Sequence, residues 1–187
     1  MNDLALFPLN TVLFPGGRLP LRIFEQRYMG MAKACLKDGT PFGVCLIREG
    51  KEVGTPATPY EVGTLATIQS WDMAQLGVLN IVALGRQRFR VRERRVQDDG
   101  LARATIDLLD PDTDAPPPAD SVAVKLLQRV VDQQPGLFEP PPRLDSSSWV
   151  SARLAELLPI PLQEKQALLE LLDARERLSR LSALLKA

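Results

Sequence analysis

Histidine is absent from this chain of 187 residues, and its absence removes several kinds of site at once. Imidazole is the commonest metal ligand and the commonest general base near neutral pH. A Ser-His-Asp or Cys-His catalytic centre therefore has no base in this sequence, and a zinc site that needs histidine cannot form. We expect no catalytic residues, no metal ion and no cofactor.

Cysteine is scarce as well. Cys35 and Cys45 are the only two, and their spacing does not form a C-x-x-C motif. Small secreted domains that depend on disulfides are much richer in cysteine. We interpret both residues as buried, reduced thiols.

Net charge and long apolar runs are the other absences. Lysine plus arginine and aspartate plus glutamate both total 23, so nothing attracts the whole chain to nucleic acid or to an anionic membrane. No apolar run approaches the roughly 20 residues of a membrane span. The N-terminal residues MNDLALFPLN lack the basic start of a signal peptide. We expect a cytoplasmic protein with no membrane partner.

Short, alternating apolar segments fill the first part of the chain and predict β-strands. These segments are residues 4–7, 42–48, 61–73, 77–85, 88–96 and 101–109. One helix interrupts them and ends at Gly39, a residue suited to the left-handed position after a helix. Its expected buried face, at helical spacing, is Phe24, Tyr28, Met31 and Cys35.

A glycine pair, Gly16-Gly17, follows an apolar run and raises the question of a phosphate-binding loop. Such a loop needs a helix directly after the glycines, whereas Leu19-Pro20-Leu21 follows here. Pro15 favours a type II turn with glycine as the next residue. The sequence therefore predicts a structural corner between strands.

Proline and acidic residues dominate residues 110–120, DPDTDAPPPAD, and predict a stiff, exposed linker whose carboxylates have no catalytic or metal role. Helices are expected after it, at 121–133, at 149–158 and from Pro161 to the end of the chain. In the last helix Asp173 and Arg177 have the spacing of a surface ion pair. Its apolar seam is Leu168, Leu171, Ala174, Leu178, Leu181 and Leu185.

Four segments, in this order, resemble the N-terminal substrate-binding domain of the ATP-dependent Lon proteases. They are LFPLNTVLFPGGRLPLRIFEQRY, EVGTLATI, GRQRFRV and LPIPLQEKQALLELLDARERLSRL. The resemblance implies an α+β fold, with a bent β-sheet or pseudo-barrel of the PUA-like type at residues 1–115. A helical lobe at residues 116–187 would complete the same domain.

The ATPase and peptidase segments that follow this domain in Lon have no counterpart in the sequence. The phosphate-loop motif GxxxxGK[ST] is absent, because the only Gly-Lys pair, Gly50-Lys51, is followed by Glu52. The resemblance therefore implies a non-enzymatic module that binds unfolded or apolar polypeptide segments, or a protein partner.

Apolar residues in expected turns and linkers are the candidate peptide-binding residues. An exposed apolar patch is typical of a docking surface, although the same side chains could instead pack inside the fold, and both interpretations stay open. The candidates are Trp71, Met73, Leu76, Leu137 and Phe138.

Arginines crowd the strand expected at 88–96 and offer an alternative function. Because PUA-like folds elsewhere bind RNA, an RNA-binding module is the alternative, with Arg88, Arg90 and Arg92 on one strand face. A solvated face balanced by neighbouring carboxylates explains the same pattern, and aromatic residues for base stacking are few. The candidate arginines are Arg86, Arg88, Arg90 and Arg92.

Overall fold

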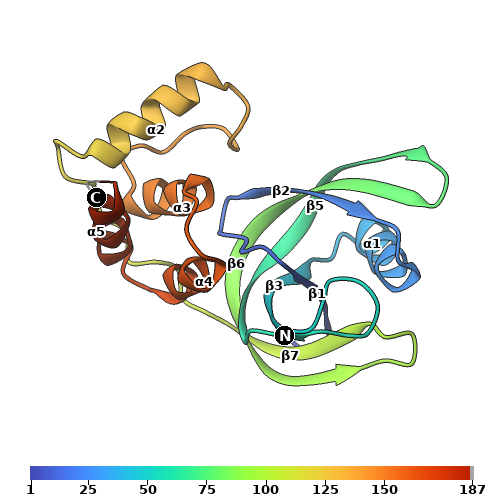
Figure 1. Ribbon diagram of the computed structural model, residues 1–187. Helices are drawn as coiled ribbons and strands as arrows, with labels where there is room; N and C mark the ends of the chain where they lie inside the picture. Colours follow the sequence, from blue (N-terminus) through green and yellow to red (C-terminus); the bar gives the residue numbers. More distant parts are fainter. Residues whose placement is uncertain (186–187) are drawn as a thin grey trace. The chain divides into compact units, whose positions relative to one another are not determined.

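The computed structural model describes residues 1–185 and groups the chain into two compact units, Met1–Leu109 and Asp110–Ala187. Within the described residues, the first unit holds seven strands and one helix, and the second unit holds four helices (Figure 1). The predicted α+β fold class is confirmed, with the strands preceding the helical part.

The strands of the first unit include all the predicted segments, and β2 and β4 are additional. Residues 77–85 and 88–96, which were expected to be two strands, form one continuous strand of 19 residues. The elements of this unit are β1 (Leu4–Leu9), β2 (Arg18–Ile23), α1 (Gln26–Asp38), β3 (Phe42–Glu49), β4 (Thr58–Pro59), β5 (Val62–Gln75), β6 (Val78–Val96) and β7 (Ala102–Leu108).

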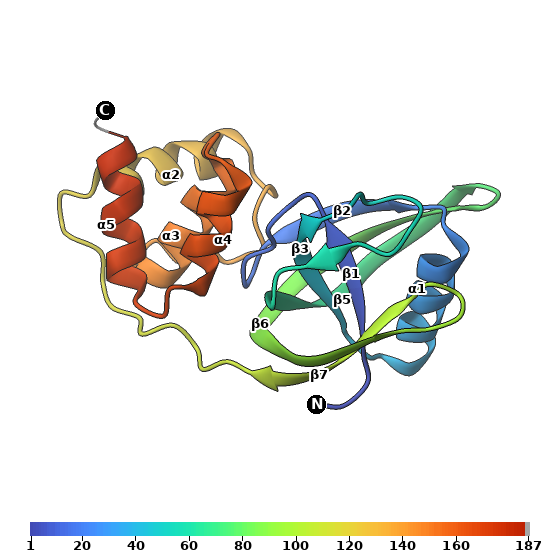
Figure 2. The same ribbon diagram turned by 60° about the horizontal axis from the view of Figure 1, so that its bottom comes forward.

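Five of these strands close into a ring. The antiparallel order runs from β1 through β7, β6 and β5 to β3, and β3 returns to β1 by parallel pairing that starts at Leu6 and Gly43. Strand β6 is long enough to pair with β2 along its first half and with β7 along its second half. Figure 2 shows the sheet curling around on itself, as the predicted bent sheet requires.

Alternation along the strands creates two apolar cores, one on each face of the curved sheet. Phe42 and Val44 belong to the core that includes Tyr28 and Met31 of α1. Cys45, one position further, belongs to a second core on the opposite face, inside the ring. Phe89 is fully buried at the centre of this second core.

Helix α1 begins later than its apolar spacing predicted. Gln26 is its first residue, so Phe24 precedes the helix and remains 52% exposed. The prediction that Phe24 belongs to the buried face is therefore wrong, whereas Tyr28, Met31 and Cys35 are buried as expected. Gly39 ends the helix with a φ of 65°, as predicted.

The corner before β2 is a turn formed by Phe14, Pro15 and the two glycines. Gly16 has a φ of 75°, and the amide of Gly17 donates to the carbonyl of Phe14 at 2.9 Å. This is the hydrogen bond and the positive φ of a type II turn. Gly85 of β6 fixes the corner with two backbone bonds of 2.8 Å, to Gly16 and Gly17. The predicted structural role is confirmed.

Replacing Gly16 with valine is expected to lower the free energy of unfolding by about 1 kcal/mol or more, because a β-branched residue is strained at positive φ. Thermal melting followed by circular dichroism measures the change. Gly30→Ala is the control, since this glycine lies in α1 and has no atom within 4 Å of an added Cβ. An unchanged melting temperature for Gly16→Val would contradict the assignment of the turn.

The second unit contains α2 (Val122–Gln133), α3 (Ser147–Leu157), α4 (Leu162–Glu170) and α5 (Ala174–Leu184). The prediction of one helix from Pro161 onward is wrong, because the chain leaves the helix after Glu170 and starts a new one. The carboxylate of Asp173 accepts from the amides of Arg175 at 2.8 Å and Glu176 at 3.2 Å, so Asp173 caps α5. No helix within residues 1–185 has the length and apolarity of a membrane span.

The segment rich in proline and acid is tied into the second unit. The amide of Thr113 donates to the carbonyl of Leu172 at 2.9 Å, and Asp114 accepts from the hydroxyl of Ser146 at 2.6 Å. The side chain of Asp112 is only 8% exposed and pairs with Arg177. The two compact units divide after Leu109. Within the segment Asp112 is shielded, whereas Thr113 and Asp114 are exposed, as expected for a linker.

Candidate functional site

A hairpin formed by the ends of β5 and β6 carries apolar side chains into solvent. Its turn is Leu76-Gly77, and Figure 1 shows this hairpin as the green projection of the first unit. Trp71 is 59% exposed, Met73 is 39% exposed and Leu76 is 95% exposed. These are the three residues that the sequence placed near a hairpin tip, and the structure brings them together on one hairpin.

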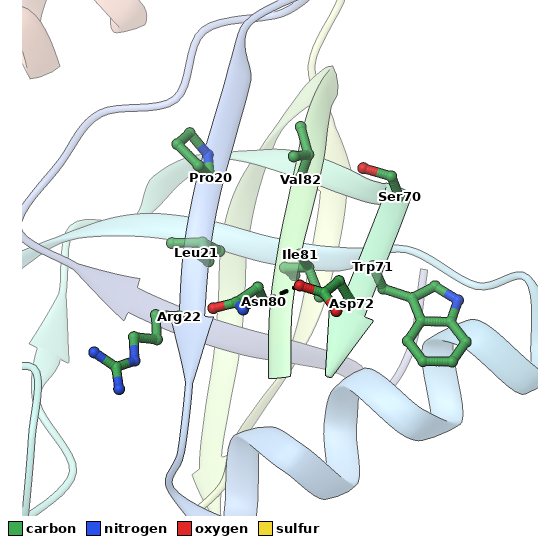
Figure 3. A pocket seen from close by; sticks show the side chains of 9 residues that line it. All are labelled: Pro20, Leu21, Arg22, Ser70, Trp71, Asp72, Asn80, Ile81 and Val82. Atoms are coloured by element: carbon green, nitrogen blue, oxygen red, sulfur yellow. Dashed lines mark hydrogen bonds between the residues drawn. The ribbon is translucent and has the colours of Figure 1, made fainter. Parts of the chain in front are cut away.

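A groove of about 350 Å³ crosses three strands beside this hairpin. Figure 3 shows the side chains that line it, three from each strand. They are Pro20, Leu21 and Arg22 of β2, Ser70, Trp71 and Asp72 of β5, and Asn80, Ile81 and Val82 of β6.

The strand register arranges these residues in rows across the sheet. The first row is Pro20, Val82 and Ser70; the second is Leu21, Ile81 and Trp71; and the third is Arg22, Asn80 and Asp72. Because successive side chains point to opposite faces of a sheet, the first and third rows share one face. Ile81 points the other way, into the core under α1, where it is 2% exposed.

The two rows on the groove face differ in chemistry. Pro20 and Val82 present apolar surface, whereas the third row carries a cation, an amide and a carboxylate side by side. The amide of Asn80 donates to Asp72 at 3.5 Å, and the guanidinium of Arg22 donates to Gln75 at 3.3 Å. An apolar strip next to hydrogen-bonding groups suits a ligand that combines apolar side chains with backbone amides.

Irregularities in the pairing determine which side chains reach this surface. The register of β5 against β6 shifts between Ile68 and Ser70, so Gln69 is an extra residue in β5. Trp71 consequently shares a row with Ile81, but at a position beyond the core, where it remains exposed. Pro20 is compatible with its place in β2 because β2 is an edge strand that pairs with β6 alone.

Leu137 and Phe138, the other two candidates, belong to the second unit. The ring of Phe138 packs edge-on against Trp149, with centroids 5.4 Å apart and planes at 79°. Phe138 therefore takes part in packing within its unit, and Leu137 beside it is 39% exposed. The five candidate residues are divided between the two units and do not form one continuous strand surface.

The candidate arginines do not share one exposed face. Arg88 is 2% exposed, although it pairs with β5 in regular register, as do Phe89 and Arg90. The guanidinium of Arg86 donates to the hydroxyl of Thr67 at 2.9 Å. Arg90 and Arg92 are exposed, and Arg92 pairs with Asp107 of β7. Arg88 and Arg90 lie on the same strand face, as predicted, but the burial of Arg88 removes it from the surface that could contact a phosphate.

The two cysteines are buried, and neither forms a disulfide, as predicted. Burial inside the ring raises the pKa of the Cys45 thiol to about 12. Burial also raises the pKa of Cys35, although a hydrogen bond with Thr40 opposes this shift. Both side chains therefore stay protonated and unreactive at neutral pH.

The model of the ATP-dependent protease La (LON) substrate-binding domain family matches residues 3–187, and the chain belongs to this family. The resemblance inferred from the four sequence segments is thereby confirmed.

Individual relatives agree with this assignment. The chain is 31% identical to Lon protease 2 of Myxococcus xanthus over 94% of its own length and 22% of that protein. It is 33% identical to protein cereblon of Danio rerio over 72% of this chain and 31% of that protein. The crystal structure of a Lon N-terminal domain protein from Xanthomonas campestris superposes with a TM-score of 0.80, at 36% identity and 98% coverage of both chains. The chain thus spans about a fifth of the length of the Lon proteases that it matches.

Proposed function

We propose that this chain binds apolar segments of unfolded polypeptides in the cytoplasm and does not cleave them. The family to which it belongs is that of the Lon substrate-binding domain, which supports recognition of protein substrates and supplies no catalytic step. The observation that carries the proposal is the exposure of Trp71, Met73 and Leu76 on one hairpin, next to the groove of Figure 3.

The groove supplies both kinds of contact that a peptide needs. An apolar side chain of the peptide would lie over Pro20 and Val82, which form the apolar row. Its backbone amides would exchange hydrogen bonds with Asn80 and Ser70, since each of these side chains both donates and accepts. Arg22 and Asp72 carry opposite charges, so the groove prefers neither a positively nor a negatively charged peptide.

The hairpin supplies the apolar area. Leu76 occupies a turn position where a polar residue is usual, and nearly its whole side chain is in water. Burying such a side chain is worth about 1.5–3 kcal/mol. Met73 adapts its shape to different partners, which suits the recognition of varied sequences. Affinity is expected to be weak, because an unfolded peptide loses conformational entropy when it binds.

Replacing Trp71 with alanine is expected to weaken binding about 30-fold, the effect of about 2 kcal/mol that is typical of an exposed tryptophan that becomes buried on binding, here on the hairpin at the edge of the groove. β-Casein serves as the unfolded ligand. The chain has two tryptophans, so in a Trp149→Phe background the fluorescence of Trp71 reports occupancy directly. The Trp71→Ala variant is compared by isothermal titration calorimetry.

Leu108→Ala is the matched control, because this leucine is 47% exposed on β7, outside the hairpin and the groove. It is expected to bind as the unmodified chain does. Equal losses in both variants, or saturable binding that never changes the fluorescence of Trp71, would contradict the assignment of the site.

Salt dependence separates this function from RNA binding by the arginine strand. Binding to phosphates falls steeply with added salt, whereas binding of an apolar peptide changes little. The pairing of Arg92 with Asp107 and of Arg95 with Asp3 lowers the charge available to phosphates. An affinity for single-stranded RNA that exceeds the affinity for β-casein and is lost in Arg90→Ala would favour the nucleic-acid function instead.

A further inference from the structure

A second cavity lies within the helical unit, between the proline-rich segment and α5. Its volume is about 560 Å³, and its walls are Pro116, Pro117 and Pro118 on one side and one face of α5 on the other. The residues of α5 recur at i, i+3, i+4 and i+7, the spacing of a single helix face. They are Arg175, Leu178, Ser179 and Ser182.

The proline wall is held in place before any ligand arrives. Each proline ring fixes its own φ, so the segment has little conformational freedom to lose. A backbone hydrogen bond from the amide of Ser147 to Ala115, at 2.9 Å, attaches its start to α3, and a turn bond from the amide of Ser121 to Pro118, at 3.0 Å, orders its end. A preformed wall reduces the entropic cost of binding.

The cavity combines apolar walls with donor groups from α5 alone. The proline rings and Leu178, which is 3% exposed, provide the apolar surface. Within residues 1–185, the side chains of Arg175, Ser179 and Ser182 make no hydrogen bond or ion pair. The proline nitrogens carry no hydrogen, so the side-chain donors of the cavity are the guanidinium and the two hydroxyl groups.

The acidic residues around Arg175 are already engaged. Asp173 accepts from the amides of Arg175 and Glu176 as the cap of α5. The carboxylate of Glu176 pairs with Arg180 at 2.5 Å. Arg175 therefore contributes a positive charge at the cavity that no carboxylate among the described residues neutralises directly.

We infer that this cavity binds a small monocarboxylate with an aliphatic body. Cavities of about 300–1,000 Å³ with apolar walls and a few converging polar groups are typical of ligand sites. A guanidinium binds a carboxylate through two parallel hydrogen bonds, and the serine hydroxyls add further donors. Arg175 provides one positive charge at the cavity, which matches the single negative charge of a monocarboxylate. This site lies in the helical unit and does not depend on the proposed recognition of polypeptides.

Octanoate, titrated into the full chain by isothermal calorimetry, tests the inference. Octanoate is expected to bind saturably at one site, whereas octan-1-ol and octylammonium, which have the same apolar body without the negative charge, are expected to bind at least about tenfold more weakly. Arg175→Gln is expected to lower the octanoate affinity at least about tenfold, and Arg175→Lys, which keeps the charge without the planar fork, less than that.

Arg129→Gln is the matched control, since Arg129 is an exposed arginine of α2 that does not line the cavity. It should leave octanoate binding unchanged. Because Arg175 is exposed, its variants are expected to keep the circular dichroism spectrum of the unmodified chain. The inference is overturned if octanoate shows no saturable binding, if octan-1-ol binds equally well, or if Arg129→Gln loses as much affinity as Arg175→Gln.

Discussion

Replacing Asp112 with alanine is expected to lower the free energy of unfolding of the helical unit by about 3–5 kcal/mol, the cost of leaving one partner of a buried ion pair alone. The side chains of Asp112 and Arg177 are 8% and 2% exposed, so neither charge reaches bulk water. Asp112 also accepts from the hydroxyl of Ser148 at 2.7 Å, which ties the proline-rich segment to α3.

The remaining contacts of Arg177 do not compensate for the lost carboxylate. Its guanidinium donates to the hydroxyl of Ser151 at 2.9 Å and to the carbonyl of Leu171 at 3.2 Å. These neutral acceptors satisfy hydrogens but leave the positive charge without a counter-charge, and burial of an unpaired charge is costly. The loss should therefore greatly exceed the effect of an exposed ion pair, which is about 0–1 kcal/mol.

Urea unfolding followed by the fluorescence of Trp149, in a Trp71→Phe background, reports on the helical unit alone, because Trp149 lies in α3. Asp120→Ala is the control, an acidic residue of the same region whose side chain is fully exposed beside Lys125. The double variant Asp112→Leu/Arg177→Met should be more stable than Asp112→Ala, since it removes both charges together. If Asp112→Ala unfolds at the same urea concentration as Asp120→Ala, the buried pair does not stabilise this unit.

Arg177 also shows where sequence patterns stop being informative. Spacing alone paired it with Asp173 on the surface, because residues four apart on a helix are neighbours. In the structure Asp173 is the cap that starts α5, and Arg177 is turned inward to a carboxylate far away in the sequence. A local pattern gives the neighbours along a helix but does not reveal a partner from a distant segment.

The features of the first unit that were predicted correctly are local ones. Alternation identified β3, β5 and β7, and the Pro-Gly-Gly sequence identified the turn at Gly16. Closure of the ring was not predictable in this way, since it depends on parallel pairing of β1 with β3 across α1. The burial of Arg88 was not predictable either, because the regular alternation of Arg86 to Arg92 gives no sign of it.

The candidate site, too, was predictable from the sequence only in its local features. Trp71 and Leu76 were identified because apolar residues beside a turn have few neighbours to bury them. The groove was not identified, because it is formed by the register of three strands, and Pro20 enters it from β2. Phe138 could not be separated from the exposed candidates, since its packing partner, Trp149, lies further along the chain in α3.

Gly63→Ala is the other substitution expected to have a large effect, because the interior of the ring has no room for a methyl group. A Cβ at this position would lie 2.5 Å from the carbonyl oxygen of Val44, 2.6 Å from the sulfur of Cys45 and 2.8 Å from the ring of Phe89. The φ of Gly63 is not positive, so the glycine is required for space rather than for conformation. Overpacking a core costs about 1–3 kcal/mol, and a clash with backbone places Gly63→Ala at or above the upper limit.

Gly43→Ala gives the matched comparison. A Cβ there would meet only the ends of side chains, at 2.7 Å from Phe89 and 2.9 Å from Leu4 and Leu6. Shortening Phe89 to leucine should therefore recover part of the stability lost in Gly43→Ala. The same change should recover less in Gly63→Ala, where the carbonyl of Val44 remains in the way and cannot move without disturbing the pairing of β3 with β5.

Urea unfolding of the single and double variants, followed by Trp71 in a Trp149→Phe background, measures both coupling energies in one experiment. A Gly63→Ala variant as stable as the unmodified chain would show that the ring interior can expand. Equal recovery by Phe89→Leu in both backgrounds would show that the aromatic ring, and not the backbone of β3, sets the limit. With the expected outcome, the ring is closed so tightly that its interior cannot hold a ligand, and recognition is confined to the outer surface of this unit.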